Sequence, residues 1–237
     1  MIPTDTKGPH AGAPVFQAGE PLATARVAVV LLHGRGGEAG RTLEMARLLP
    51  SDKVCFLAPA AADNSWYPQR FLEPVALNEP WLTSALAVVS REVARITTAG
   101  VPAERILVGG FSQGACLALE WALRAGIRLG GVFALSGGVI GEPGAPRPHD
   151  RDLAGTPVFL ACGDADGHIP VARVLESSAL LRARGAALTE RIYPGVGHII
   201  VSDEFSVVGR MITEAAASKR VRTAETSRGP STGAGEP

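Results

Sequence analysis

The stretch ILVGGFSQG (residues 106–114) joins an apolar run over 106–109 to a segment of helical period over 113–125. Ser112 lies between two glycines at this junction, where a sharp strand-to-helix turn would hold its hydroxyl clear of the sheet and within reach of a base. The start of the helix also directs backbone N–H groups toward the place where negative charge develops on a substrate oxygen. A serine flanked in this way by two glycines can arise by chance in a chain with 28 glycines. Its position between a strand and a helix nevertheless favours Ser112 as a nucleophile.

β-Branched or apolar runs alternate with segments of helical period along the rest of the chain. These runs lie over 27–32, 54–57, 106–109, 131–135, 158–161 and 188–193, and the helical segments over 39–49, 79–98, 113–125, 171–185 and 203–217. Strands that are apolar throughout and separated by helices are typical of a parallel sheet covered on both faces. We therefore expect an α/β fold with a mostly parallel central sheet. The segment over 136–156 is too short for a large cap domain, so the site should be open.

The composition predicts one globular domain with a tail at each end. The chain has 237 residues, of which 46% are hydrophobic and 19% charged, and single α/β domains of this size are common. Residues 1–24 contain Gly, Pro and Ala without a period, and residues 218–237 are rich in Ser, Thr, Gly and Arg. We expect a flexible tail over 1–24, a catalytic domain over 25–217 and a disordered tail over 218–237.

Charge and hydropathy argue for a small-molecule partner. Lys plus Arg and Asp plus Glu number 23 each, so no overall field attracts nucleic acid. No apolar run reaches the roughly 18 residues that a membrane span requires, and the first residues lack the pattern of a secretory signal. We expect a cytoplasmic protein whose partner is a small ester molecule, and we leave open whether it forms a homodimer.

The cysteines predict neither disulfides nor a metal site. Cys55, Cys116 and Cys162 are odd in number, widely spaced and set in apolar segments, which is typical of buried free thiols. The Gly36-Gly37 pair completes no phosphate-binding motif. The sequence therefore predicts no cofactor and no metal.

A serine nucleophile at a strand-to-helix turn of this kind is followed along the chain by an acid and then a histidine. The histidines after Ser112 are His149, His168 and His198. His198 ends the glycine-rich loop YPGVGH, which follows the strand predicted over 188–193 and precedes the last predicted helix. This setting favours His198 as the base.

The acid is expected on the loop GDADGHIP (residues 163–170), which follows the preceding strand. Two carboxylates compete there. We favour Asp166, which would orient the imidazole of His198 and stabilise its charged form. Asp164 is the alternative, and its second interpretation is a turn residue that bonds its own backbone. A calcium loop would need ligand spacing that does not follow.

The loop LHGRGG (residues 32–37) is expected to stabilise the oxyanion. The backbone amide of Arg35 would join that of Gln113, while His33, which precedes the nucleophile, would brace the loop. The guanidinium of Arg35 has two interpretations: it meets an acidic group on the substrate, or it makes no specific contact. Trp66, Tyr67 and Phe71 follow the second predicted strand, where they line the substrate pocket or pack the loop against the core.

These motifs together resemble the phospholipase/carboxylesterase family of α/β-hydrolases, which includes the acyl-protein thioesterases. The resemblance covers residues 27–205. It rests on Leu32-His33-Gly34, Ser65-Trp66-Tyr67, Gly110-Phe111-Ser112-Gln113-Gly114, Leu135-Ser136-Gly137-Gly138, Asp166-Gly167-His168-Ile169-Pro170 and Tyr193-Pro194-Gly195-Val196-Gly197-His198. It implies an α/β-hydrolase fold, the triad Ser112, Asp166 and His198, and an oxyanion hole made by the amides of Arg35 and Gln113.

The chain departs from the thioesterase pattern at three places. Arg35 stands where thioesterases usually have an apolar residue, Trp66 is not closely followed by an aspartate, and His168 replaces an apolar residue. His168 places a titratable group near the acid, is the fourth residue expected to line the substrate pocket, and resembles the bacterial esterase branch. The sequence therefore predicts a serine carboxylesterase that acts on small to medium esters through an acyl-enzyme. The alternatives are an acyl-protein thioesterase, a lysophospholipase and a non-catalytic binding module.

Overall fold

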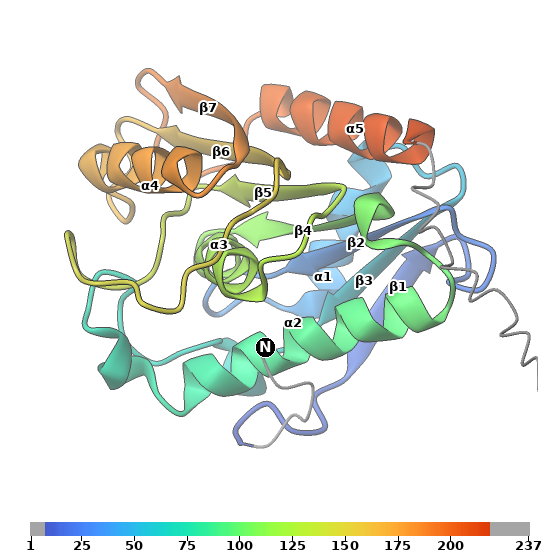
Figure 1. Cartoon of the computed structure of the whole chain (residues 1–237), viewed down its shortest axis with the longest axis horizontal. Coiled ribbons are helices and arrows are strands. Elements are labelled where there is room, and N and C mark those ends of the chain that lie inside the picture. The colour runs from blue at the N-terminus through green and yellow to red at the C-terminus, as the bar shows by residue number, and fades with distance from the viewer. Residues whose placement is uncertain (1–7, 219–237) are drawn as a thin grey trace, which may run out of the picture.

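A seven-stranded sheet forms the centre of the computed structural model, which describes residues 8–218 (Figure 1). The strand order is β1-β3-β2-β4-β5-β6-β7, and all neighbours are parallel except β1 and β3. The strands are β1 Val15–Gly19, β2 Val27–Leu32, β3 Val54–Pro59, β4 Ile106–Phe111, β5 Gly131–Leu135, β6 Pro157–Gly163 and β7 Ala187–Tyr193. The predicted α/β fold with a mostly parallel sheet is therefore confirmed.

Helices cover both faces of this sheet (Figure 1). The helices are α1 Ala39–Thr42, α2 Trp81–Thr98, α3 Gln113–Ala125, α4 Val171–Ala183 and α5 Ser202–Ala217. Strand β2 shows how the layers form, because successive side chains of a strand point to opposite faces. Its residues Val27, Val29 and Leu31 belong to the core under α1 and α5, while the alternate residues join the core under α2, α3 and α4. A strand buried on both faces needs apolar residues throughout, which is the pattern the sequence shows.

The N-terminal tail predicted over 1–24 is wrong for the residues that the structure describes. Val15–Gly19 forms the edge strand β1, which pairs antiparallel with β3. No hydrophobic pattern marks this strand in the sequence, because an edge strand is held by backbone hydrogen bonds and needs little buried apolar surface. His10 is fully buried, and its Nδ1 accepts a hydrogen bond from Ala62 N at 3.0 Å. The tail predicted over 218–237 lies outside the described residues from 219 onward.

The parallel strands place three chemical groups at one edge of the sheet. Ser112 follows β4, Asp166 follows β6 and His198 follows β7. Because the carboxyl ends of parallel strands meet at the same edge, the loops that carry these residues are neighbours. Residues 136–156 form a loop with turns, as predicted, and leave this edge without a large cap. Within residues 8–218, no helix combines the length and the apolar character needed to cross a bilayer.

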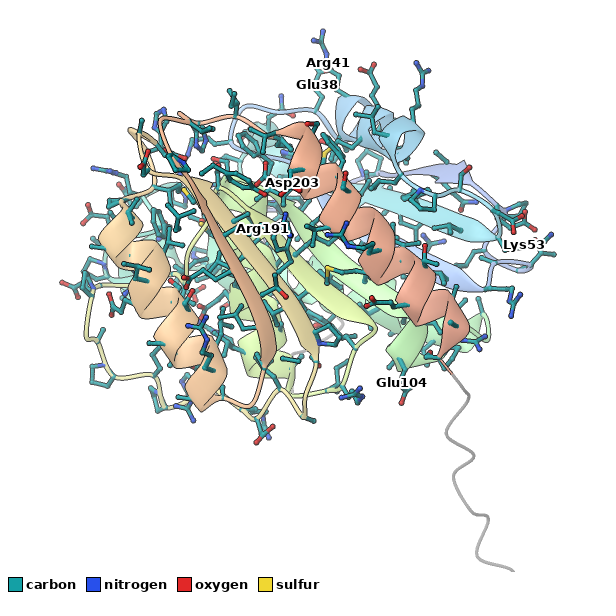
Figure 2. The ribbon with its side chains drawn as sticks, turned by 90° about the horizontal axis from the view of Figure 1, so that it is seen from above. Glu38, Arg41, Lys53, Glu104, Arg191 and Asp203 are labelled. Atoms are coloured by element: carbon teal, nitrogen blue, oxygen red, sulfur yellow. The ribbon has the colours of Figure 1, made fainter. Side chains whose placement is uncertain are left out.

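An ion pair fixes the two ends of the loop that carries His198. Arg191 of β7 donates to Asp203 of α5, and both side chains are labelled in Figure 2. The Oδ2 atom of Asp203 also accepts a hydrogen bond from the hydroxyl of Tyr193 at 2.7 Å. The loop over 194–201 is therefore held on both sides, which restrains the position of His198.

Glu204 is a buried carboxyl at the start of α5. It is 1% exposed, and its Oε2 accepts a hydrogen bond from Val201 N at 2.7 Å. Burial raises the pKa of Glu204 from its usual 4.5 to about 7, because the charged form is poorly solvated there. The folded state therefore binds this proton more tightly than the unfolded state does. The associated stability is fully present below pH 4.5 and is lost as the pH rises through 7.

We expect the Glu204→Gln variant to lose less stability than the wild-type protein between pH 5 and pH 8. The amide keeps an acceptor for Val201 but has no proton to lose, so the difference should be on the order of 1–2 kcal/mol. Urea unfolding at a series of pH values measures it. Glu214→Gln, which changes an exposed carboxyl of the same helix, is the matched control. Equal pH slopes in the wild type and Glu204→Gln would contradict the prediction.

Candidate active site

Ser112 occupies a strained turn between β4 and α3. Its φ of 55° and ψ of −118° lie in a region that residues with side chains rarely adopt. The turn is fixed by Ser112 N, which donates to Leu135 O at 2.9 Å, and by Cys116 N, which donates to Ser112 O at 3.0 Å. A Cβ atom at Gly110 or Gly114 would collide with the carbonyl oxygen of Leu32. Glycines are therefore required on both sides of the serine because β2 passes so close.

A chain of hydrogen bonds links the three predicted triad residues. Nε2 of His198 lies 2.9 Å from Oγ of Ser112, and Nδ1 of His198 lies 2.7 Å from Oδ2 of Asp166. The other carboxylate oxygen of Asp166 accepts hydrogen bonds from the backbone of His168 at 2.8 Å and of Ile169 at 3.0 Å. Burial alone would raise the pKa of Asp166, but the hydrogen bonds from His198 and the two amides outweigh it and lower that pKa. Asp166 is therefore ionised when it meets the imidazole.

Asp164, the alternative acid, makes a different contact. Its Oδ1 accepts a hydrogen bond from Gly195 N at 2.6 Å, which joins the loop after β6 to the loop after β7. The second interpretation, a turn residue that bonds its own backbone, is therefore wrong, because the partner of the Asp164 side chain lies on another loop. The ring of His168 lies beside that of His198 at the site, with the two ring centroids 4.7 Å apart.

His33 braces the loop after β2, as predicted. Its Nε2 accepts a hydrogen bond from Ala61 N at 3.0 Å, and its carbonyl accepts one from Trp66 Nε1 at 2.9 Å. Burial lowers the pKa of His33, so the ring is neutral and can accept this bond. The loop after β2 is therefore joined to the loop after β3 by His33.

Arg35 and Gln113 hold the same segment with their side chains. The guanidinium of Arg35 donates to three successive carbonyls, those of Tyr67, Pro68 and Gln69, at 3.0, 2.7 and 2.5 Å. The Gln113 amide accepts from Trp66 N at 3.0 Å and donates to Tyr67 O at 2.8 Å. The interpretation that the Arg35 side chain makes no specific contact is therefore wrong, while a contact with an acidic substrate group stays a prediction. The charge of Arg35 orders a neighbouring loop, because a planar guanidinium presents several donors in a fixed arrangement.

Gln113 follows the nucleophile directly, and the loop that carries Arg35 comes close to Ser112 at Gly34. Gln113 is the first residue of α3, so its N–H has no acceptor within the helix. Arg35 lies on the loop after β2, and Gly36 N of this loop donates to Asn64 O at 2.7 Å. The two side-chain anchors described above therefore fix the positions of the two amides that the sequence predicts as the oxyanion hole.

A pocket of about 300 Å³ opens beside Ser112. It is lined by Arg35, Tyr67, Arg70, Phe71, Ser112, Gln113, Cys116, His168, Ile169 and His198. Three of the four predicted pocket residues, Tyr67, Phe71 and His168, are among them. Trp66 is not: it is fully buried, with its ring packed against His33 at a centroid distance of 4.9 Å. The placement of Trp66 in the pocket is therefore wrong, because its side chain turns into the core.

Cys116 is a pocket residue that the sequence analysis missed. The signal was its spacing, since a residue four positions after Ser112 on a helix lies on the same face. Cys116 is 1% exposed, and burial raises the pKa of its thiol to about 12. All three cysteines are free and buried, as predicted.

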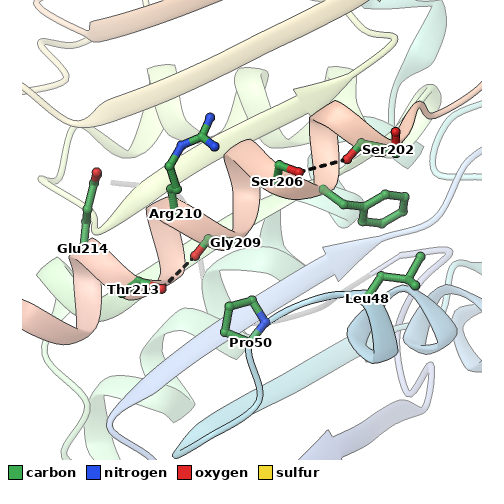
Figure 3. Close-up of a pocket in the computed structure, with 9 residues that line it drawn as sticks. Leu48, Pro50, Ser202, Ser206, Gly209, Arg210, Thr213 and Glu214 are labelled. Carbon is green, nitrogen blue, oxygen red and sulfur yellow. Dashed lines mark hydrogen bonds between the residues drawn. The ribbon is translucent and has the colours of Figure 1, made fainter.

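A larger pocket lies away from Ser112, between α5 and the loop before β3 (Figure 3). Its volume is about 670 Å³. Two hydroxyls on its wall are bonded within α5: Ser206 Oγ donates to Ser202 O at 3.3 Å, and Thr213 Oγ1 donates to Gly209 O at 3.0 Å. None of the three predicted triad residues lines it, so volume alone does not identify the reacting centre.

The chain is similar to proteins of one family. The family model for phospholipase/carboxylesterase matches residues 15–215. A solved phospholipase/carboxylesterase from Dyadobacter fermentans is 42% identical with a TM-score of 0.82, and the match covers 88% of this chain and 100% of that one. Acyl-protein thioesterase 1 of Neurospora crassa is 27% identical over 211 residues, which are 78% of this chain and 85% of that protein.

A third relative shows the same fold at lower identity. The carboxylesterase of Bacillus cereus is 22% identical with a TM-score of 0.67, and the match covers 86% of this chain and 95% of that one. The family model spans nearly all of the described residues, including the strained turn at Ser112. The chain belongs to the phospholipase/carboxylesterase family of α/β-hydrolases and is a serine hydrolase.

Proposed function

We propose that this enzyme hydrolyses small to medium carboxylic esters through an acyl-enzyme on Ser112. His198 takes the proton of the Ser112 hydroxyl as its oxygen attacks the ester carbonyl. The tetrahedral intermediate places its negative oxygen between the amides of Arg35 and Gln113. His198 then gives the proton to the departing alcohol, and water activated by His198 releases the acid. Asp166 holds the imidazole in orientation and stabilises its charged form.

The observation that carries this proposal is the position of His198 between its two partners. Its Nε2 is 2.9 Å from the Ser112 hydroxyl, and its Nδ1 is 2.7 Å from a carboxylate whose pKa is lowered. A general base must lie within hydrogen-bond reach of the proton it abstracts, and both distances meet that requirement. The arrangement therefore supports proton transfer from serine to histidine without rearrangement.

The size of the pocket favours a small ester over a long acyl chain. At about 300 Å³ it is at the lower end of the range for ligand sites. Phe71, which is 6% exposed, and Tyr67, which is 1% exposed, both line it. A thioesterase activity on long acyl chains would require more apolar length than this lining provides.

We expect kcat/KM for p-nitrophenyl alkanoates to be highest for short acyl chains and to fall as the chain outgrows the pocket. A methylene that fits contributes roughly 0.8 kcal/mol by its burial, whereas one that the pocket cannot hold gains nothing and crowds the packed lining. Steady-state kinetics over acyl chains of two to sixteen carbons measures the profile. A maximum at palmitate would favour the thioesterase alternative, and its preference should then appear on a matched acyl thioester.

A further inference from the structure

The hydroxyl of Tyr67 is a buried donor that the proposed mechanism leaves unused. Tyr67 is 1% exposed and lines the pocket beside Ser112. No nitrogen or oxygen atom of the described residues bonds to its buried hydroxyl oxygen, whose polar neighbour is the thiol of Cys116. A buried hydroxyl is costly unless a partner replaces the water it has lost. This donor therefore lacks a good acceptor in the enzyme without substrate.

The Cys116 thiol is a poor substitute for an oxygen acceptor. Sulfur accepts hydrogen bonds weakly in its protonated form. Burial raises the pKa of Cys116 to about 12 and that of Tyr67 well above 10, so both groups keep their protons at neutral pH. The Sγ atom also accepts a hydrogen bond from Gly138 N at 3.4 Å. Tyr67 is thus a neutral donor whose hydroxyl has no oxygen acceptor within the described residues.

Tyr67 and Cys116 lie at the inner part of the pocket. Arg35, Arg70 and His168 are exposed, whereas Tyr67 and Cys116 are each 1% exposed. The lining therefore runs from a charged, solvent-facing rim to a buried end where a hydroxyl and a thiol meet.

The chemistry places the acyl half of the ester at this end. The departing alcohol must lie against His198, which protonates it, and His168 packs beside that ring at 4.7 Å. The acyl carbon is bonded to Ser112 in the acyl-enzyme. Cys116 lies one helical turn beyond Ser112, and its N–H donates to Ser112 O at 3.0 Å. Ser112, Cys116 and Tyr67 line the same pocket, so an acyl group on Ser112 that extends inward would approach the thiol and the hydroxyl beside it.

We propose that the acyl group of the preferred substrate carries an oxygen acceptor, as a hydroxyl, ether or keto group, that accepts a hydrogen bond from the Tyr67 hydroxyl. This inference rests on the proposed function, because it requires an acyl group held at Ser112. Short oxygenated acyl esters are then favoured over plain alkanoates. A site with a buried donor discriminates strongly against an analogue that leaves the donor unpaired.

The kinetic test compares acyl groups of equal length with and without an ether oxygen. The pairs are p-nitrophenyl methoxyacetate with butanoate and p-nitrophenyl 3-methoxypropanoate with pentanoate. For each pair, the kcat/KM ratio of wild type is divided by that of Tyr67→Phe, which cancels the intrinsic reactivity of the esters. We expect a quotient of about ten or more for at least one pair. Tyr193→Phe, the change at the only other tyrosine of the chain, should keep the wild-type ratios.

Two kinetic results are contrary and can be told apart. Quotients of one for both pairs, with all esters hydrolysed, would overturn the role of Tyr67 and leave the proposed function standing. Failure of the wild-type enzyme to hydrolyse any ester would instead overturn the proposed function.

Stability gives a readout that does not depend on activity. Removal of an unpaired hydroxyl should leave Tm of Tyr67→Phe equal to or above that of the wild type. Tyr193 donates to Asp203 at 2.7 Å, so Tyr193→Phe should lower Tm by about 2–4 °C. An equally large fall in Tyr67→Phe would show that the hydroxyl already has a partner inside the protein, and the inference would be wrong.

Discussion

Replacement of Ser112 by alanine should lower kcat for ester hydrolysis by about 10⁴- to 10⁶-fold while the protein stays folded. The hydroxyl lies 2.9 Å from Nε2 of His198 and is the atom that forms the acyl-enzyme in the proposed mechanism. Without it, the amides of Arg35 and Gln113, which we propose as the oxyanion hole, remain, and they would account for the small residual rate. Steady-state kinetics with a short p-nitrophenyl ester measures the loss.

The Ser112→Ala variant needs a control for folding, because Ser112 has a φ of 55° that alanine also adopts reluctantly. Thermal unfolding of the variant should show a cooperative transition like that of the wild type. Ser206→Ala, which changes a serine on the exposed side of α5, is the matched control for activity. Retention of more than a few per cent of kcat by a purified, folded Ser112→Ala protein would remove Ser112 from its proposed role.

Replacement of Asp166 by asparagine should lower kcat by about 10³- to 10⁴-fold. The carboxylate accepts a hydrogen bond from His198 Nδ1 at 2.7 Å, and an amide in its place favours the wrong tautomer of the ring. Asp164→Asn should change kcat by less than about tenfold, because Asp164 bonds to Gly195 N and an amide oxygen can still accept that bond. The two variants together separate the two acids.

The comparison of Asp166→Asn with Asp164→Asn has a clear contrary outcome. If Asp164→Asn were the variant that lost activity while Asp166→Asn kept it, the acid would be assigned to the wrong carboxylate. The pH dependence gives a second check, since Asp166 is ionised well below neutral pH and its removal should affect kcat throughout the neutral range.

The central strands and the order of the site loops could be predicted because burial on both faces leaves a strong pattern. A strand such as β2 must be apolar at every position, and the sequence shows directly that a glycine-rich loop follows it. Strand β1 could not be predicted in this way. It is held by backbone pairing to β3, and its side chains are mostly exposed or half-buried, so no hydrophobic period marks it.

In the site, residues that a motif identifies could be predicted, whereas side-chain positions that depend on packing could not. Motif and chain order placed Ser112 and His198 in the loops where the structure has them, because covalent chemistry dictates the residue types. Trp66 was placed in the pocket by its type, but whether a large ring points into a cavity or into the core depends on distant residues such as His33. The contacts of Arg35 likewise depend on a loop more than thirty residues away, which spacing alone does not reveal.

Covalent labelling with a fluorophosphonate tests the central claim most directly, because this reagent reacts with an activated serine and leaves a stable adduct. Digestion and mass spectrometry then locate the adduct. The proposed mechanism predicts one adduct per chain, on Ser112, and a labelling rate that falls sharply in His198→Ala. An adduct on another residue, or labelling of Ser112 that proceeds equally fast without His198, would contradict the proposal that Ser112 is activated by His198.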